Sequence, residues 1–209
     1  MVALTSDQQT VAREIIRKPM YFLRDVLGAT PYRKQREISE AVATSRRISV
    51  VGCNGSGKDW AAARMALWWM ASRYPAKVII TGPTGRQVND IVWNELRSAY
   101  NNSLSPLGGT LYDSSRLRLD EEHFAVGFST DDPYGLQGYH SPDLMVIVTE
   151  AHAMRQVDIE ALRRLNPNCF LITGNPFVQA GELYNSHHTS RHLYSTIQIS
   201  AFDTPNLTS

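Results

Sequence analysis

The sequence has 209 residues, of which 43% are hydrophobic and 20% are charged, and its formal net charge is +1. These values are ordinary for one globular domain with a sizeable core, and they exclude a low-complexity or strongly basic chain. Nucleic-acid binding stays open, because a basic patch can exist on a neutral chain. Two cysteines, Cys53 and Cys169, are too few for a disulfide framework and fit a reducing cytosol. We find no signal peptide and no apolar stretch long enough to cross a membrane.

Three helices are expected before the first strand. Ser6 and Gln9 have the spacing of a capping box that opens a helix over residues 6–17. Residues 21–28 predict a second, short helix that ends at a glycine. The dipeptide "TP" then starts a third helix over residues 30–44.

Strands and helices alternate after this helical segment. Aliphatic and β-branched runs predict buried strands, and the amphipathic stretches between them predict helices. The expected strands cover residues 47–52, 77–81, 144–149, 169–173 and 196–200, and the expected helices cover 58–73, 86–100 and 157–165.

The middle of the chain carries two further expectations. The helix over 86–100 is predicted to turn one apolar face inward, formed by Val88, Ile91, Val92 and Leu96. Residues 102–115 are expected to be a polar connection. The alternating stretch that follows, from 116 to 128, predicts an antiparallel hairpin.

The order of elements predicts an α/β fold, with a mostly parallel sheet flanked by helices. Ligands in such sheets bind beyond the carboxyl ends of the strands. Distinctive polar motifs follow Val51, Thr81, Val148 and Thr173, each at the end of a predicted strand. This agreement indicates one site along that edge.

The first motif is "GCNGSGKD", which departs at one position from the phosphate-loop pattern G-x-x-x-x-G-K-S/T. Glycines let backbone N–H groups converge on a phosphate, and the following helix directs its N-terminus at the same place. Lys58 supplies a charge to the β- and γ-phosphates. The alternative is a glycine-rich turn with a surface lysine. The predicted nucleotide-binding residues are Gly52, Cys53, Asn54, Gly55, Ser56, Gly57, Lys58 and Asp59, joined by Gln35.

The second motif is "LMVIVTEAH", an aliphatic strand that ends at Thr149 and Glu150. It is similar to a Walker B strand, which usually ends in Asp-Glu. At this position Glu150 can orient and deprotonate the attacking water, so Glu150 and Lys58 are the predicted catalytic residues. The alternative for Glu150 is a surface ion pair at a strand end.

Asp59 and Thr149 depart from the usual pattern together. A hydroxyl normally stands at the first position and a carboxylate at the second, and both belong to the magnesium site. We therefore hypothesise an exchange in which Asp59 and Thr149 bind Mg²⁺, directly or through water, with the charge of the site unchanged. The alternatives are an acidic residue in a first helical turn and an ordinary β-branched strand residue.

Two weaker motifs complete the predicted site. The amide of Gln35, in "TPYRKQREI", can donate to and accept from the edge of adenine, which suits ATP. The turn formed by Thr173, Gly174 and Asn175 can contact the γ-phosphate or the water and report hydrolysis. The histidine-rich stretch 187–192 is interpreted as solvated surface, because its spacing is not that of a metal-ligand set.

These pieces together resemble the ATPase domain of the large terminase subunit of tailed bacteriophages. The resemblance runs from about Pro19 to the end of the sequence. It rests on "PYRKQREI", "GCNGSGKD", "TGPTGRQVNDIVWNELR", "GLQGYHSPDLMVIVTEAH", "FLITGNP" and "SAFDTPNLT". It implies a RecA-like P-loop fold with an added strand between the loop strand and the Walker B strand.

The resemblance also implies roles and a setting. Gln35 would be the adenine glutamine, Glu150 the catalytic glutamate, and Thr173-Gly174-Asn175 the coupling motif, with ATP and Mg²⁺ as cofactors. Some members carry an arginine inside the loop, which this sequence lacks, so a neighbouring subunit would supply that charge. The candidates by sequence are Arg33, Arg36, Arg86, Arg155, Arg163 and Arg164.

The implied domain organisation is a single ATPase domain over 1–209. It comprises a helical segment (1–30), a nucleotide-binding core (31–180) and a last strand with the start of a lid or linker (181–209). A C-terminal nuclease domain, which full-length large terminases carry, is expected to be absent. The expected partners are double-stranded DNA, a portal protein, a small terminase subunit and further copies in a ring, with no membrane. The expected location is the host cytoplasm, docked transiently on a procapsid.

Two other functions compete with a DNA-packaging ATPase. "TEAH" is one letter from a DEAH box, which favours a helicase fragment, although a helicase needs a second RecA-like domain that this length does not hold. The double departure at Asp59 and Thr149 favours a nucleotide-binding module with impaired catalysis.

Overall fold

The computed structural model describes residues 17–130 and 139–205. They form one eight-stranded sheet with the strand order β3-β4-β5-β2-β6-β7-β1-β8. The strands are β1 (Arg47–Gly52), β2 (Ala76–Gly82), β3 (Thr110–Tyr112), β4 (Arg116–Arg118), β5 (Phe124–Ser129), β6 (Asp143–Val148), β7 (Cys169–Gly174) and β8 (Ser195–Ile199). Six neighbouring strands, from β5 to β8 in this order, are parallel.

The sheet topology confirms the predicted α/β fold. All five predicted strands are present, and β7 lies between the loop strand β1 and β6, the strand predicted to be similar to Walker B. The predicted hairpin is also present, since β4 pairs antiparallel with β5. The expected polar connection over 102–115 is wrong in part. It contains the short edge strand β3, which pairs with β4 and was concealed by its three-residue length.

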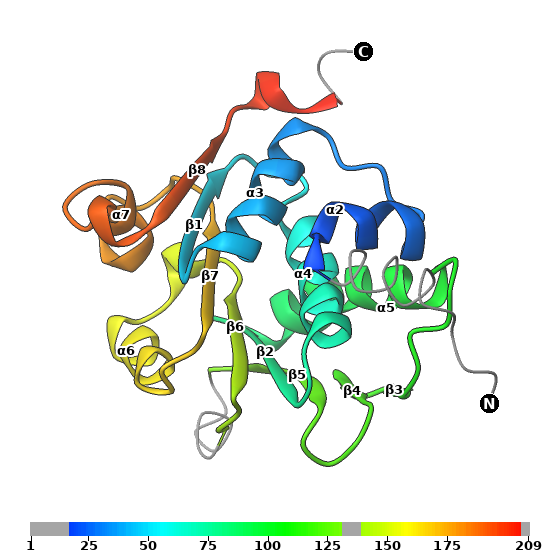
Figure 1. Ribbon diagram of the computed structural model, residues 1–209. Helices are drawn as coiled ribbons and strands as arrows, with labels where there is room; N and C mark the ends of the chain where they lie inside the picture. The colour runs from blue at the N-terminus through cyan, green and yellow to red at the C-terminus, as the bar shows by residue number, and fades with distance from the viewer. Residues whose placement is uncertain (1–16, 131–138, 206–209) are drawn as a thin grey trace.

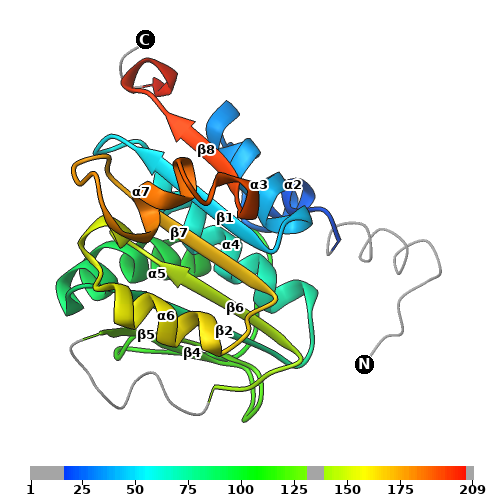
Figure 2. The same cartoon turned by 90° about the vertical axis from the view of Figure 1, so that its left-hand side faces the viewer.

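Helices cover both faces of the sheet. In Figure 2, α6 (Gln156–Arg164) and α7 (Gly181–His187) lie in front of the strands, and the remaining long helices lie behind. Those behind are α3 (Arg33–Thr44), α4 (Lys58–Ser72) and α5 (Trp93–Asn101), as Figure 1 also shows. Before them come α2 (Pro19–Tyr21) and the π-helical turn η1 (Phe22–Val26), and the 3-10 turns are η3 (Ala151–Ala153), η4 (Arg191–Leu193) and η5 (Ala201–Asp203).

The strands feed two hydrophobic cores in alternation, which explains their continuous apolar sequences. In β2, Val78 and Ile80 pack on the α4 side and Ile79 packs on the α6 side. In β7, Leu171 packs on the α4 side and Ile172 packs on the α6 side. The arrangement fixes both faces of the parallel strands, so the edge at their carboxyl ends is held in place by two cores.

Helix α4 is buried around its whole circumference. Ten of its residues are buried, including both Trp68 and Trp69, because it lies between the sheet and the outer helices α3 and α5. A helix that is apolar on all sides is stable only in such a position. Its first turn carries Lys58 and Asp59, so the surrounding core anchors the start of the predicted phosphate site.

Two helices begin at other residues than predicted, and a third predicted helix is not tested. The helix predicted over 6–17 lies almost wholly outside the described residues. Helix α3 begins at Arg33 instead of residue 30, because Tyr32 is extended and its N–H donates to the Gln35 side chain as an N-terminal cap. The second helix starts earlier, at Pro19, and Gly28 follows its end with φ +64°.

The inward position predicted for Ile91 is wrong. The helix predicted over 86–100 begins with a π-helical segment, η2 (Gln87–Val92), before α5. Its wider turn rotates Ile91 outward to 44% exposure, while Val88 and Val92 stay buried. The exposed Ile91 side chain lines the cavity described below.

Candidate nucleotide-binding site

The loop between β1 and α4 depends on glycine at two positions. Gly55 and Gly57 have φ of +70° and +73°, a region that side-chain-bearing residues rarely adopt. A Cβ atom on Gly57 would lie 2.4 Å from Nε2 of Gln35. The backbone angle therefore favours glycine at Gly57, and a larger residue there would also displace the Gln35 amide.

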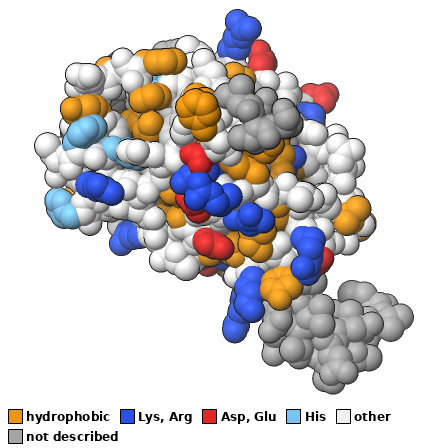
Figure 3. Space-filling view, turned by 90° about the horizontal axis from the view of Figure 1, so that it is seen from above, with side chains coloured by type: hydrophobic (Ala, Val, Ile, Leu, Met, Phe, Trp, Pro, Cys, Tyr) orange, Lys and Arg blue, Asp and Glu red, His pale blue; other side chains and the backbone are white. Residues whose placement is uncertain are grey.

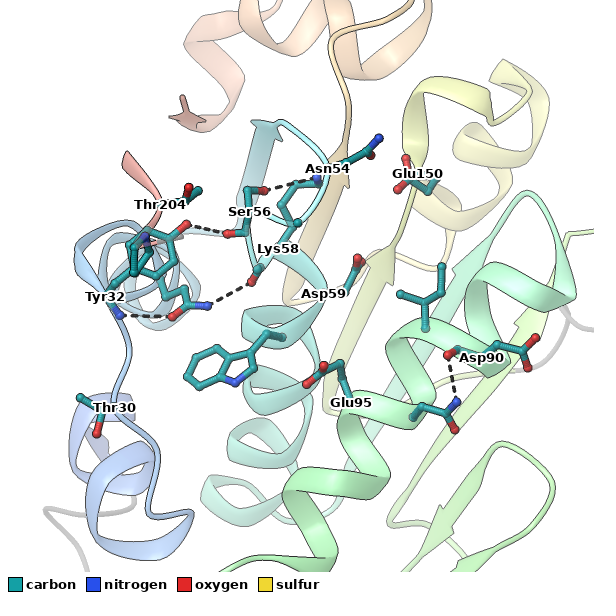
Figure 4. Close-up of a pocket in the computed structure, with 17 residues that line it drawn as sticks. Thr30, Tyr32, Asn54, Ser56, Lys58, Asp59, Asp90, Glu95, Glu150 and Thr204 are labelled. Atoms are coloured by element: carbon teal, nitrogen blue, oxygen red, sulfur yellow. Dashed lines mark hydrogen bonds between the residues drawn. The ribbon is translucent and has the colours of Figure 1, made fainter. Parts of the chain in front are cut away.

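The loop borders a cavity of about 770 Å³, a volume in the range of small-molecule sites. Figure 4 shows Tyr32 and Thr204 on one side of the loop and the acidic residues Asp59, Glu150 and Glu95 on the other. The cavity is lined by Thr30, Tyr32, Gln35, Asn54, Gly55, Ser56, Gly57, Lys58, Asp59, Trp60, Asp90, Ile91, Asn94, Glu95, Glu150, Thr204 and Pro205. It lies at the N-terminus of α4, where backbone N–H groups and the helix dipole favour an anion.

Lys58 is buried and surrounded by uncharged oxygens. Its Nζ donates to the carbonyls of Gly52 and Cys53, at 3.1 and 2.9 Å, and to Oδ1 of Asn175 at 3.0 Å. Burial lowers the pKa of the ammonium group, against the opposing effect of nearby Asp59. Gly52 and Cys53 thus hold the lysine instead of lining the cavity.

Asp59 and Thr149 are brought together as predicted. The Thr149 hydroxyl donates to Oδ1 of Asp59 at 2.9 Å, although the two residues are 90 positions apart. Thr149 is 2% exposed, and burial raises the pKa of the Asp59 carboxyl, with the hydrogen bond from Thr149 acting in the opposite direction. A half-buried carboxylate with one hydroxyl partner retains unused acceptor capacity, which fits the binding of a hard cation.

Glu150 has a backbone conformation that is unusual for its residue type. Its φ and ψ are 49° and 42°, in the left-handed region, and it is the second residue after the end of β6. Its Oε2 is buried without a hydrogen-bond partner among the described residues, and burial raises the pKa of the carboxyl group. Non-glycine residues held in this region cluster at functional sites, because the surrounding structure must compensate the strain.

The predicted coupling residues divide into two groups. Asn175 contacts the loop, since its Nδ2 donates to Oδ1 of Asn54 at 2.7 Å and its Oδ1 accepts from Lys58. Gly174 lies behind it, where a Cβ atom would be 2.7 Å from the Leu183 side chain. Thr173 is 1% exposed within β7 and does not line the cavity. The contact between Asn175 and the loop follows from β1 and β7 being neighbours in the sheet.

Gln35 reaches the site but uses its amide within the protein. Its Oε1 accepts from the Tyr32 N–H at 3.2 Å, and its Nε2 donates to the Gly57 carbonyl at 3.4 Å. Tyr32 reinforces the same junction, because its hydroxyl donates to the carbonyl of Ser56 at 2.5 Å. Burial raises the pKa of this hydroxyl to about 12. Both side chains therefore brace the loop against α3, and adenine recognition by Gln35 stays a prediction.

Several residues of the site were not predicted from the motifs. The cavity is also lined by Tyr32, Trp60, Asp90, Asn94, Glu95, Thr204 and Pro205. Tyr32 and Thr204 lie within the stretches "PYRKQREI" and "SAFDTPNLT" that carry the resemblance, so the signal was present without an assigned role. His152 contacts Glu150 and had no predicted role either; its Nδ1 lies 3.2 Å from Oε2.

The histidine-rich stretch 187–192 lies outside the cavity. Histidine side chains gather over α7 and η4 in Figure 3, and the ring of His188 stacks on Tyr184 with centroids 3.9 Å apart. No group of three or more metal-ligating side chains occurs within residues 17–130 and 139–205. Across the same residues, no helix combines the length and apolar character of a membrane span.

Solved structures of phage large terminases share this fold. The large-terminase ATPase domain of Thermus phage P74-26 matches with a TM-score of 0.66 at 19% identity, covering 88% of this chain and 86% of that domain. The large terminase of another thermophilic bacteriophage has a TM-score of 0.64 at 12% identity, covering 81% of this chain and 46% of that protein. The HK97 bacteriophage large terminase has a TM-score of 0.64 at 14% identity, covering 88% of this chain and 43% of that protein.

These comparisons establish the fold. The chain has the fold of large-terminase ATPase domains, an α/β sheet of the RecA-like type. It spans less than half the length of the last two of these proteins. No protein-family model matches the sequence, and no curated protein matches it.

Proposed function

We propose that this chain is the ATPase domain of a phage large terminase, and that its ATP hydrolysis drives double-stranded DNA into a procapsid. The observation that carries the proposal is the convergence of Lys58, the Asp59–Thr149 pair and Glu150 on one cavity at the carboxyl edge of the sheet. A terminase ATPase fold around this set of residues supports ATP as the ligand.

The positions of the site residues suggest separate roles in phosphate binding and in activation of a water. The loop N–H groups and Lys58 would bind the phosphates, because both lie at the positive end of α4. Glu150 lines the cavity, and its carboxylate group can orient and deprotonate a water. Its raised pKa makes it a stronger base than an exposed glutamate.

Asp59 and Thr149 are the residues that would hold Mg²⁺, directly or through water. The ion would supply neutralisation of phosphate charge. In the structure the carboxylate is on the loop helix and the hydroxyl on the Walker B strand, and the two share a hydrogen bond. This contact supports the exchange hypothesis, because a compensating pair must lie at one place.

Phosphate release by wild type and Glu150→Gln tests the catalytic assignment. We expect Mg²⁺-dependent release by the wild type and a loss of about 100-fold or more in the variant, since a general base contributes on that order. Nucleotide binding should change little. Glu122→Gln is the matched control, because Glu122 is an exposed glutamate distant from the cavity. Equal release by wild type and Glu150→Gln at high protein concentration would contradict the assignment.

A double-mutant cycle tests the exchange. Asp59→Thr and Thr149→Asp should each weaken Mg²⁺-dependent nucleotide binding, and the double variant should recover part of the loss. Binding is the readout, so the test does not depend on turnover. Losses that simply add would refute the exchange and favour the second candidate, a nucleotide-binding module with impaired catalysis, which the two departures from the usual pattern suggest.

The proposed partners are double-stranded DNA, a portal protein, a small terminase subunit and further copies of the chain in a ring. Stimulation of hydrolysis by DNA separates a packaging motor from a helicase. We expect a larger increase with duplex than with single-stranded DNA. The reverse order would favour the helicase.

A further inference from the structure

At the carboxyl edge of the sheet, His152 contacts both the predicted base Glu150 and the predicted coupling residue Asn175. It belongs to η3, which is separated from the end of β6 by two residues, and its Nδ1 is 3.2 Å from Oε2 of Glu150. The same Nδ1 is 3.3 Å from the backbone N of Asn175, in the turn after β7. One ring nitrogen thus contacts both the predicted base and the predicted coupling segment.

This nitrogen cannot form both hydrogen bonds at once. When Nδ1 carries no hydrogen, it accepts from the N–H of Asn175 and turns its lone pair toward the Glu150 carboxylate, which repels it. When Nδ1 carries a hydrogen, it can donate to Glu150, and the N–H of Asn175 loses its acceptor. The two tautomers of the neutral ring therefore favour different partners.

The surroundings hold the ring at this position. Glu150 has a left-handed backbone, and its carboxylate contacts His152 of η3. Gly174 leaves the required space, because a Cβ atom there would lie 3.1 Å from Nδ1. Phe177 packs edge-on against the imidazole with centroids 5.7 Å apart. A sideways shift of the ring is restricted, so exchange of the tautomer is the available response.

Asn175 connects this switch to the phosphate loop. Its side chain accepts from Lys58 at 3.0 Å and donates to Asn54 at 2.7 Å, while its backbone N–H faces His152. Figure 4 shows Asn54 and Lys58 on the loop side of the cavity and Glu150 across from them. A phosphate that draws Lys58 away removes one of the bonds that fix Asn175.

We propose that His152 is a positioning residue that links the orientation of Glu150 to the state of Asn175, and hence to occupancy of the phosphate loop. The inference rests on the ATPase activity proposed above. With the loop empty, Nδ1 accepts from Asn175 and leaves Glu150 unbonded, as in the structure. With phosphate bound, Asn175 is released, and Nδ1–H donates to Glu150 and fixes the carboxylate.

Two-bond ¹H–¹⁵N correlations on ¹⁵N-histidine-labelled protein test the tautomer directly. The chain has six histidines, so the signal of His152 is assigned by its loss in His152→Asn. We expect Nδ1 without hydrogen in the free protein and with hydrogen after addition of Mg²⁺ and a non-hydrolysable ATP analogue. Binding of the analogue without a change of tautomer would overturn this inference alone. An analogue that does not bind would overturn the proposed function as well.

Kinetics give a second, independent test. His152→Ala should lower kcat by about tenfold or more and change KM by less than about threefold, since positioning affects the transition state more than binding. His152→Asn should recover most of kcat, because its amide can donate or accept near the same position. His192→Ala, which alters an exposed histidine in η4, should behave as wild type. A parallel loss in both parameters without rescue by asparagine would indicate a merely structural role.

Discussion

Lys58 and Lys77 are both buried lysines at opposite ends of the parallel sheet, 4% and 7% exposed, and their surroundings differ. Lys77, at the amino end of β2, donates to the Glu122 carboxylate at 2.8 Å and to the His140 carbonyl at 2.9 Å. Lys58, at the carboxyl end, has only uncharged oxygens as hydrogen-bond partners. Lys58 therefore has no hydrogen-bonded counter-charge, and burial lowers its pKa although Asp59 and Glu150 act in the opposite direction. The buried charge is less well compensated at the carboxyl end of the sheet than at the amino end.

The same contrast extends to other buried polar atoms. Within the described residues, three of those without a hydrogen-bond partner follow or end neighbouring strands at the carboxyl edge: Thr81 Oγ1, Glu150 Oε2 and Thr173 Oγ1. At the amino edge, one such atom, Nε2 of His123, lacks a hydrogen-bond partner. Among the described residues, the polar side chains of the amino edge are thus more completely hydrogen-bonded than those of the carboxyl edge, where three side chains keep unused hydrogen-bonding capacity.

Exchange of each lysine for methionine is expected to separate the two ends most strongly. Lys58→Met should lower ATP hydrolysis by about 100-fold or more, because a charge that stabilises the transferring phosphate is lost. Its unfolding free energy should not fall, since a buried charge with no hydrogen-bonded counter-charge is removed. Lys77→Met should lower stability by about 1 kcal/mol and leave hydrolysis unchanged. Phosphate release and urea unfolding measure both effects, and a Lys58→Met protein that is destabilised like Lys77→Met would break the comparison.

Gly57→Ala is expected to have the next largest effect. The new Cβ would meet Nε2 of Gln35 at 2.4 Å and would stand at φ +73°, so we expect a loss of about 2 kcal/mol in unfolding free energy. Gly55→Ala is the matched control, because Gly55 has φ +70° with no atom within 4 Å of the added carbon. The difference between the two variants, measured by urea unfolding, isolates the contact with Gln35. Equal losses would mean that the α3 contact does not brace the loop.

Asp59→Asn is expected to stabilise the free protein. Burial raises the pKa of Asp59, so its contribution to stability is present in acid and is lost as the pH rises through that raised pKa. At pH 7 the ionised form is disfavoured by folding, and the amide should add about 1 kcal/mol of unfolding free energy. Mg²⁺-dependent nucleotide binding should weaken in the same variant. A free protein that becomes less stable would show that Asp59 is already compensated without a ligand.

The sequence predicted what regular patterns encode. Parallel strands such as β6 and β7 are apolar on both faces, so their runs are continuous and their ends fall at polar motifs. The site residues Lys58, Asp59 and Glu150 could be placed because the strand order brings separate motifs to one edge. The contact between Asp59 and Thr149 follows from β1 and β6 flanking β7.

What the sequence did not predict depends on local geometry without a periodic signal. The π-helical turn at η2 changes the residues per turn, and this displaced Ile91 from the inward face. The role of Gln35 as a brace depends on the approach of α3 to Gly57, which only the packed structure reveals. The position of His152 depends on the left-handed turn at Glu150, and the sequence "TEAH" does not predict that turn.

The smallest expected effect is on the pH dependence of stability, through His123 at the amino edge of the sheet. His123 is 2% exposed, its Nδ1 accepts from the Ala76 N–H at 3.2 Å, and burial lowers its pKa although nearby Asp120 acts in the opposite direction. The unfolded chain takes up a proton near the ordinary pKa of 6.5 while the folded chain does not, so stability should fall as the pH drops below that value.

His123→Gln should flatten this acid-side loss, because glutamine keeps an acceptor for the Ala76 N–H and does not titrate. Urea unfolding at pH 7.5 and at pH 5.5, about one unit on either side of 6.5, measures the difference. Asp59 and Glu150 act in the opposite sense, since their raised pKa values add stability as the pH falls. The Asp59→Asn background therefore sharpens the His123 effect. If His123→Gln leaves the pH dependence unchanged, the acid-side loss belongs to another histidine such as the half-buried His187, whose pKa burial also lowers.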